Sequence, residues 1–328
     1  MMIRDDLSIG VDIGGTKIAS VLINRKGTVL ASDYRMTEVE MGKQETIKRI
    51  LESIHSVYTE EDSISGIGID VPGLVDPREG IVENAVNLGW DRVELRKELQ
   101  MALGTKVPIF LQRDTYAQAL SEYYYGCARG EKNFVYLSLG SGLGAGALVD
   151  GKLLQGANRS ALEVGHMVLP GLKALCSCGK TGCVETILSG PGMLRTYQDV
   201  SWQAQIPSAL SEKKDLTLAE ISAAFTTGEE RSRALFAEVS HYAAIVIAGI
   251  LSVLNPSLVI IGGGTGLAIY DAIQAQMKAE IEQLTWKENV RNVRIEKSSL
   301  DSSALGAASL VWYGMTDNQE HQIFQEVN

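Results

Sequence analysis

A glycine turn that directly follows an apolar strand recurs in this chain and constrains the fold more than any other feature. Leu7 to Gly27 reads as strand, turn, strand, with Asp12-Ile13-Gly14-Gly15-Thr16-Lys17 as its turn. Phe134 to Val149 repeats this order around Gly140-Ser141-Gly142-Leu143-Gly144. Short apolar runs bounded by glycine predict strands joined by tight turns. The two copies are too far apart for a solenoid, so they predict an α/β protein with two similar lobes.

Chain length and charge restrict the possible functions. With 328 residues, two domains are expected, because a domain usually contains about 100–200 residues. The net charge of −10 disfavours nucleic acid as a partner, since phosphate backbones need a basic surface. Ala243 to Leu254 is apolar but shorter than the ~20 residues that span a bilayer, so it predicts a buried core helix. Met1 to Ser8 lacks the apolar segment of a signal peptide, and we expect a cytoplasmic protein without a membrane partner.

The glycine turns also suit phosphate binding, because they present backbone N–H groups without a Cβ in the way. One such turn is more often a purely conformational device, but a third, Gly262-Gly263-Gly264, follows the predicted strand Leu258 to Ile261. Asp12 can hold Mg²⁺ through water, and Thr16 or Lys17 can contact phosphate oxygens. None of the turns fits the Walker pattern or opens a helix as a Rossmann fingerprint does. Together they predict a nucleotide clamp between two lobes.

Three of the four cysteines crowd into one short loop. Cys176, Cys178 and Cys183, together with His166, form a Cys₃His set that suits a closed tetrahedral Zn²⁺ site. The alternative is a loop that carries three reduced thiols without a metal. A zinc with four protein ligands is structural, and it would fix the orientation of His166. Cys127 lies outside this set and reads as a small core residue.

These motifs resemble those of the hexokinase–actin superfamily and, within it, of the ROK family (repressors, open reading frames and kinases). The first two glycine turns resemble the two phosphate motifs of the superfamily, and Gly262-Gly263-Gly264 resembles its adenosine motif. The ROK signature is matched by Glu163-Val164-Gly165-His166 and by Cys176-Ser177-Cys178-Gly179-Lys180-Thr181-Gly182-Cys183-Val184-Glu185. The resemblance extends from about Ile9 to about Leu310.

The resemblance implies a fold and an activity. It implies two ribonuclease-H-like, actin-like lobes around a central cleft, with the last helix returning to the first lobe. We expect a small lobe from residues 1–115 plus about 303–328 and a larger lobe with the zinc loop from residues 116–302. The implied activity is transfer of phosphate from ATP to a hexose hydroxyl, at C6 in most of the family. The expected protein is a homodimer that acts in carbohydrate metabolism on a small-molecule sugar.

The resemblance also implies the residues of the site. The catalytic base is Asp114, which follows the short strand Phe110 to Arg113 and is also the expected N-cap of a helix that starts at Thr115. The implied sugar ligands are Gly73, Asn87, Arg113, Glu163, His166 and Glu185. The implied ATP ligands are Asp12, Gly14, Gly15, Thr16, Lys17, Gly140, Ser141, Gly142, Gly263 and Gly264, with ATP, Mg²⁺ and a structural Zn²⁺ as cofactors.

The chain departs from the family pattern around the expected sugar pocket. Arg113 and Tyr116 stand where Asn is common, and Arg159 and Leu162 replace small residues before Glu163. Glucose, allose, N-acetylmannosamine and 3-amino-3-deoxyglucose therefore all stay candidates. Arg only donates hydrogen bonds, whereas Asn both donates and accepts, so Arg113 can change how secondary hydroxyls are recognised. Relatives that resemble allose kinases also carry Arg here; in the alternative, Arg113 swings out to pair with a carboxylate.

Two other functions compete with a kinase. Part of the family regulates transcription through a helix-turn-helix domain placed before the first phosphate motif. Here eleven residues precede Asp12 and the net charge is negative, which disfavours DNA binding. A sugar sensor without kinase activity is the second alternative, and the presence of Asp114, Asp12 and the glycine turns disfavours it.

Overall fold

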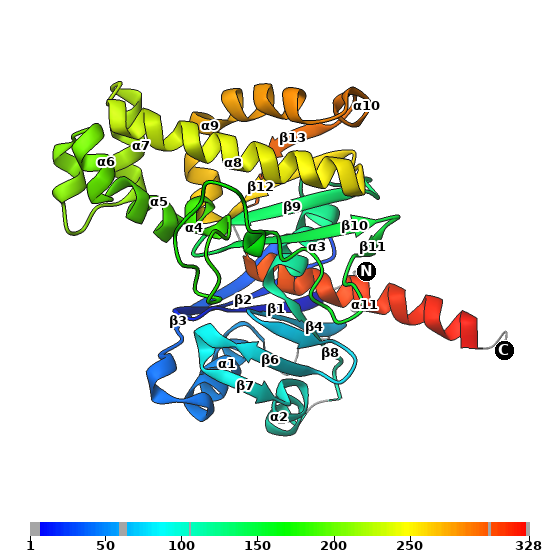
Figure 1. Cartoon of the computed structure of the whole chain (residues 1–328). Coiled ribbons are helices and arrows are strands. Elements are labelled where there is room, and N and C mark those ends of the chain that lie inside the picture. The colour runs from blue at the N-terminus through cyan, green and yellow to red at the C-terminus, as the bar shows by residue number, and fades with distance from the viewer. Residues whose placement is uncertain (1–6, 59–63, 105, 301–302, 326–328) are drawn as a thin grey trace. The chain divides into compact units, whose positions relative to one another are not determined.

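The computed structural model describes residues 7–58, 64–104, 106–300 and 303–325. Its internal contacts divide the chain into two compact units. The first unit contains Met1–Gly130, Gln155–Ala161 and Ser299–Asn328, and the second contains Glu131–Leu154 and Leu162–Ser298. Each unit combines strands with helices, which confirms the predicted α/β class (Figure 1). The lobe boundary after residue 115 stays a prediction.

The first unit is built on a five-stranded mixed sheet. Its strand order is β3-β2-β1-β4-β8. β1 pairs with β2 in antiparallel register, as the first strand–turn–strand pattern predicts, while β4 and β8 continue the sheet in parallel. The strands are β1 (Leu7–Ile13), β2 (Lys17–Asn24), β3 (Val29–Met36), β4 (Gly66–Val71) and β8 (Ile109–Arg113).

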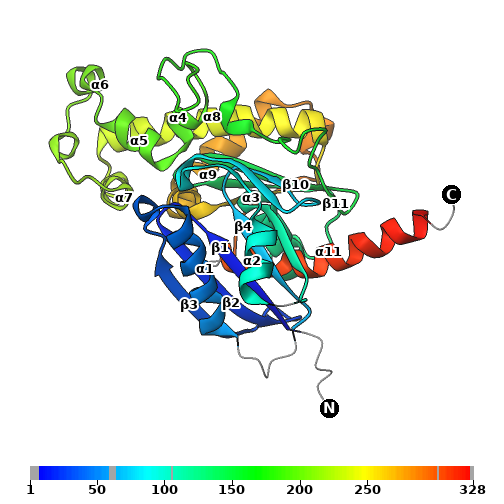
Figure 2. The ribbon, with the colours of Figure 1, turned by 90° about the horizontal axis from the view of Figure 1, so that it is seen from below.

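Helices cover both faces of this sheet (Figures 1 and 2). α1 (Lys43–Val57) buries Ile47, Ile50 and Ile54 against alternate residues of β1, as its helical spacing predicts. α11 (Ser303–Gln325) lies on the opposite face, beside α3 (Asp114–Tyr125). Glycine allows this close approach, because a Cβ at Gly68 would lie 1.8 Å from the carbonyl oxygen of Ala307.

A second, three-stranded sheet extends the first unit. Its order is β5-β6-β7, and both pairs are antiparallel. Its elements are β5 (Leu74–Asp76), β6 (Ile81–Ala85), β7 (Trp90–Val93) and the following helix α2 (Leu95–Leu103). The predicted sugar-site residues Gly73 and Asn87 lie at its ends, before β5 and between β6 and β7.

The second unit repeats the strand arrangement of the first. Its order is β11-β10-β9-β12-β13, with β9 and β10 antiparallel and β12 and β13 added in parallel. The antiparallel hairpin followed by a parallel neighbour confirms the predicted internal repeat. The strands are β9 (Phe134–Leu139), β10 (Leu143–Val149), β11 (Lys152–Leu153), β12 (Leu258–Gly262) and β13 (Arg294–Lys297).

Two long helices, α8 (Glu230–Leu254) and α9 (Gly263–Leu284), pack against each other beside this sheet (Figure 1). α8 is long and apolar enough to cross a membrane by length and composition alone, but most of its apolar window is buried inside the protein. This burial agrees with the core helix predicted for Ala243 to Leu254. The shorter helices of the unit are α4 (Glu185–Leu188), α5 (Gly190–Tyr197), α6 (Val200–Gln205), α7 (Leu218–Thr226) and α10 (Lys287–Val290).

Candidate functional site

The first glycine turn is closed by a hydrogen bond of its own backbone and by Thr37, which directly follows β3. The N–H of Gly14 donates to the carbonyl oxygen of Lys17 at 2.8 Å. Thr37, which is fully buried, donates from its hydroxyl to the Gly14 carbonyl at 2.7 Å and from its N–H to the Thr16 carbonyl at 2.9 Å. Thr16 and Lys17 stay exposed. Thr37 lies outside the glycine motif, so sequence reasoning missed it.

Gly15 brings this turn against a predicted sugar ligand. A Cβ at position 15 would lie 2.9 Å from the carbonyl oxygen of Asn87. Gly73 has a φ of 99°, which is left-handed, and a Cβ there would lie 2.8 Å from the Cα of Ala85. Gly15 therefore lies against Asn87, and Gly73 against Ala85, within one unit, and glycine is required at both positions.

Asp12, the penultimate residue of β1, lies beside a second carboxyl group that sequence reasoning did not select. Asp12 and Asp70 are register partners on the parallel strands β1 and β4. Asp70 is fully buried, and its polar side-chain partner is the neighbouring carboxylate of Asp12. Burial, with Asp12 and Asp114 as negative neighbours, raises the pKa of Asp70 well above its ordinary value. Ser303, the first described residue of α11, donates its hydroxyl to Asp12.

The predicted base stands at the start of α3. The helix begins at Asp114 and Arg113 occupies its N-cap position, so the expectation that Asp114 is the N-cap is wrong by one residue. The extended backbone of Arg113, with ψ of 147°, is the reason. The half-buried Asp114 carboxylate accepts the Thr115 N–H at 2.7 Å. It therefore lies at the positive end of the helix dipole, which favours an ionised carboxylate.

Three of the residues that depart from the family pattern make contacts within the first unit. Arg113 is only 8% exposed, and its guanidinium carbon lies 5.1 Å from the ring centroid of Tyr116. The Tyr116 hydroxyl donates to the carbonyl of Ala161 at 2.9 Å. Two residues earlier, Arg159 forms an ion pair with Asp76. Arg113 thus packs inside the protein rather than swinging out into solvent.

The second glycine turn is held from three elements of the second unit. The carbonyl of Gly140 accepts the N–H of Gly190 at 2.9 Å and the hydroxyl of Thr265 at 3.3 Å. The N–H of Leu143 donates to the Glu185 carboxylate at 2.9 Å. Ser141 at its tip is exposed. Glu185, predicted as a sugar ligand, therefore also supports a predicted phosphate turn.

The third glycine run corrects an expectation. It does open a helix, because β12 ends at Gly262 and α9 begins at Gly263. Gly263 has a φ of 77°, which lets the chain change direction within one residue. A Cβ at Gly263 would lie 2.3 Å from the carbonyl oxygen of Leu139, so only glycine fits. The exposed Gly264 follows on the first turn of α9, at a helix end that favours anions.

The Cys₃His set comes together as predicted. The ligand atoms of His166, Cys176, Cys178 and Cys183 all lie within 4.8 Å of one another. The Cys178 and Cys183 sulfurs are 3.6 Å apart, and the Cys176 sulfur is 3.7 Å from His166 Nδ1. A tetrahedral site with metal–sulfur bonds of about 2.3 Å places its ligands about 3.8 Å apart, so this set fits such an ion.

The remaining cysteine and histidine features agree with a closed site. Burial, with the Cys178 and Cys176 thiols as neighbours, raises the pKa of the Cys183 thiol to about 12. Glu163 immediately precedes the short 3₁₀ turn Val164–His166, and its carbonyl accepts the His166 N–H at 3.1 Å.

Cys127, predicted as a core residue, is instead half-buried, and its thiol donates to Glu122 at 3.2 Å.

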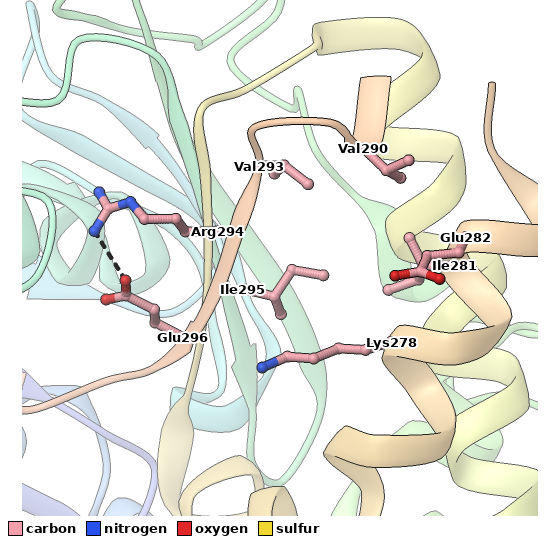
Figure 3. Close-up of a pocket in the computed structure, with 8 residues that line it drawn as sticks. All are labelled: Lys278, Ile281, Glu282, Val290, Val293, Arg294, Ile295 and Glu296. Atoms are coloured by element: carbon pink, nitrogen blue, oxygen red, sulfur yellow. Dashed lines mark hydrogen bonds and ion pairs between the residues drawn. The ribbon is translucent and has the colours of Figure 1, made fainter. Parts of the chain in front are cut away.

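A cavity of about 360 Å³ lies elsewhere in the second unit, between α9, α10 and β13 (Figure 3). Ile281, Val290, Val293 and Ile295 form its apolar wall, and an Arg294–Glu296 ion pair lies at its edge. None of the predicted site residues lines it. The cavity is therefore separate from the glycine turns and the metal set.

Comparison with known proteins agrees with this geometry. The model of the ROK family matches residues 8–313. A glucokinase from Thermotoga maritima is 32% identical over 311 residues, which cover 92% of this chain and 96% of the relative. A ROK family glucokinase from Streptomyces griseus, solved in complex with glucose and AMPPNP, superposes with a TM-score of 0.76 at 27% identity and covers 93% of this chain and 98% of its own.

Regulators are also similar. A ROK family transcriptional regulator, a homologue of the E. coli MLC protein, superposes with a TM-score of 0.84 at 25% identity. The match covers 94% of this chain and 78% of the regulator. These likenesses confirm the predicted ribonuclease-H-like, actin-like fold of the lobes. By its family match, its sequence identity to glucokinases and its fold, the chain belongs to the ROK family.

Proposed function

We propose that this protein is an ATP-dependent sugar kinase that phosphorylates a hexose hydroxyl, at C6. The observation that carries the proposal is the position of Asp114, a carboxylate at the N-terminus of α3 in the same unit as the Asp12 glycine turn. Likeness to glucokinases, one of them solved with glucose and an ATP analogue, supports it. We further propose a cytoplasmic homodimer that acts on a small-molecule sugar without nucleic acid or membrane.

In this proposal Asp114 accepts the proton of the attacking hydroxyl as the γ-phosphate is transferred. In phosphoryl transfer the protein mainly positions the reactants and neutralises charge, and it does little covalent chemistry itself. The turns at Gly14-Gly15 and Gly140-Ser141-Gly142 offer backbone N–H groups to the phosphates, with Thr16 and Lys17 beside the first turn. Gly263 and Gly264 contribute the N-terminus of α9 to the nucleotide.

Two metals belong to the proposal. Asp12 would hold Mg²⁺ through water, and the bound ion neutralises phosphate charge. His166, Cys176, Cys178 and Cys183 would hold a structural Zn²⁺, which completes the loop that carries His166. With Nδ1 of His166 facing the thiols, Nε2 lies on the far side of the ring and can meet a sugar hydroxyl.

In this proposal the residues that contact the sugar are Gly73, Asn87, Arg113, Glu163, His166 and Glu185. The buried stack of Arg113 on Tyr116 supports a changed recognition of secondary hydroxyls, because a buried donor-only group selects for an acceptor. Allose, N-acetylmannosamine and 3-amino-3-deoxyglucose are therefore tested beside glucose.

A sugar-responsive regulator is the second candidate, supported by the TM-score of 0.84 to a transcriptional regulator. One experiment decides between the two: purified protein with Mg·ATP and each sugar of the panel, with ADP release coupled to a spectrophotometric readout. Sugar-dependent ADP release is expected. If sugars bind by calorimetry but none promotes ADP release, the regulator replaces the kinase.

A further inference from the structure

Leu143, which lies within the second glycine turn and is the first residue of β10, is contacted on two sides by residues next to the metal set. Its N–H donates to Glu185 Oε2 at 2.9 Å. Its carbonyl oxygen lies against Gly165, where a Cβ would come within 2.3 Å. The backbone N–H and the backbone carbonyl of Leu143 therefore both lie against residues next to the metal set.

The Glu185 carboxylate also occupies the space beside the preceding glycine. A Cβ at Gly142 would lie 2.7 Å from Glu185 Oε2, so the carboxylate fits only because position 142 has no side chain. Hydrogen bonds to a charged acceptor are about twice as strong as neutral ones. This single contact is accordingly the strongest side-chain anchor of the Gly142–Leu143 peptide among the described contacts.

Both residues that hold Leu143 are adjacent to metal ligands. Gly165 immediately precedes His166, and Glu185 follows Cys183 by two residues. The second Glu185 oxygen, Oε1, lies 3.7 Å from the Cys176 sulfur. The loop is further tied together by the N–H of Val184, which donates to the Met167 carbonyl at 2.9 Å. Two short paths, through Gly165 and through Glu185, therefore connect the four ligands to Leu143.

We propose that the metal loop is a positioning device for the glycine turn at residues 140–144: with its ligand set closed around a metal, it fixes Gly165 and Glu185, and these fix Leu143. Nucleotide affinity then depends on the metal, in addition to any effect on the sugar. The inference rests on the proposed function, because it assumes that this turn binds the ATP phosphates. Glu185 acts here as a positioning residue.

Two measurements without sugar test this proposal. The first is the affinity for Mg·AMPPNP by calorimetry, and the second is amide hydrogen exchange of Leu143. Metal removal with a chelator is expected to weaken AMPPNP about tenfold, the scale of one lost hydrogen bond to a charged group, and to speed Leu143 exchange. Glu185→Ala should do the same, and chelation of this variant should then have a smaller effect than in wild type, since only the path through Gly165 remains.

Matched variants separate this role from misfolding. Glu185→Gln keeps an acceptor for the Leu143 N–H and should bind AMPPNP within about threefold of wild type. Cys127→Ser replaces the cysteine outside the set and should change neither measurement. Unchanged Leu143 exchange after chelation, or a chelation effect of full size in Glu185→Ala, overturns the positioning role. If wild type binds no AMPPNP, the proposed function and the nucleotide part of this inference fall together.

Discussion

Asp70 lies directly opposite Asp12 on neighbouring parallel strands, and it is a fully buried carboxyl group whose polar partner is another carboxylate. A second negative charge buried beside a carboxylate is costly, and this cost raises the pKa of Asp70. Asp12 has a different environment, because the hydroxyl of Ser303 donates to it. The two aspartates thus differ in their environment. Asp12 accepts a hydrogen bond from a hydroxyl, whereas Asp70 is fully buried beside Asp12.

This pair gives a prediction for pH-dependent stability. Burial raises the pKa of Asp70, so the folded state binds a proton that the unfolded state releases above its ordinary value of 3.8. Its contribution to the free energy of unfolding is fully present below that value and is lost as pH rises through the raised pKa. Asp70→Asn removes this titration. The free energy of unfolding of the variant minus that of wild type should therefore increase as pH rises from 4 to 8, which urea unfolding at each pH measures.

Asp76 is the matched control with the opposite sign. Burial alone would raise its pKa, but the Glu79 N–H and the Arg159 guanidinium outweigh burial and lower it. Its stabilising contribution is present above the ordinary value and is lost as pH falls through the lowered pKa. Asp76→Asn should therefore cost stability at pH 7, and less at pH 3. If the free energy of unfolding of Asp70→Asn relative to wild type falls as pH rises, the account of Asp70 is contradicted.

The contact between α11 and the first sheet predicts a large effect at a glycine. A Cβ at Gly68 would lie 1.8 Å from the Ala307 carbonyl oxygen, so Gly68→Ala must push α11 away. Overpacking of this kind costs about 1–3 kcal/mol or more. Gly249 in α8 has open space around its Cα, and Gly249→Ala should be neutral or stabilise by up to about 1 kcal/mol through helix propensity. Thermal unfolding followed by circular dichroism measures both.

Asp114→Asn should lower kcat by about 10²–10⁴-fold or more while sugar affinity stays near that of wild type. Asparagine keeps the size and the contact to the Thr115 N–H but cannot accept the substrate proton. Steady-state kinetics with the best sugar, together with sugar calorimetry, make the test. A folded Asp114→Asn protein with a near-normal kcat would remove Asp114 as the base.

Elemental analysis should find about one zinc per chain, as a Cys₃His set requires. Cys178→Ser removes one of four ligands, so the zinc content should fall and the loop should become sensitive to proteolysis. Sugar affinity should weaken as well, because His166 loses its fixed orientation. Full zinc occupancy in Cys178→Ser, or a metal-free wild type, would argue for a loop of reduced thiols.

Arg113→Asn should change the order of sugars rather than the chemistry. Asparagine restores an acceptor where arginine only donates, and a mismatched polar contact can discriminate by about 10⁴-fold. Comparing kcat/KM for glucose, allose, mannose, N-acetylmannosamine and 3-amino-3-deoxyglucose in both proteins measures this. If glucose is the best substrate of both with similar constants, the stack of Arg113 on Tyr116 is structural only.

Much of the fold follows from local patterns. Alternating and continuous apolar runs determine β1, β9 and β12, and helical spacing determines α1, because side-chain period and burial are properties of a short segment. The Cys₃His set is also local, since its three cysteines and His166 lie close in sequence and few chemistries use such a set.

Only the tertiary structure decided which distant groups meet. Thr37 closing the first turn, Asp70 opposite Asp12, and Glu185 on Leu143 join segments that no short pattern relates. The start of α9 at Gly263 escaped prediction because glycine has a low helix propensity, and here the close carbonyl of Leu139 and a positive φ require it. Sequence alone determined the kinds of residue available for the site, whereas packing between remote strands determined their partners.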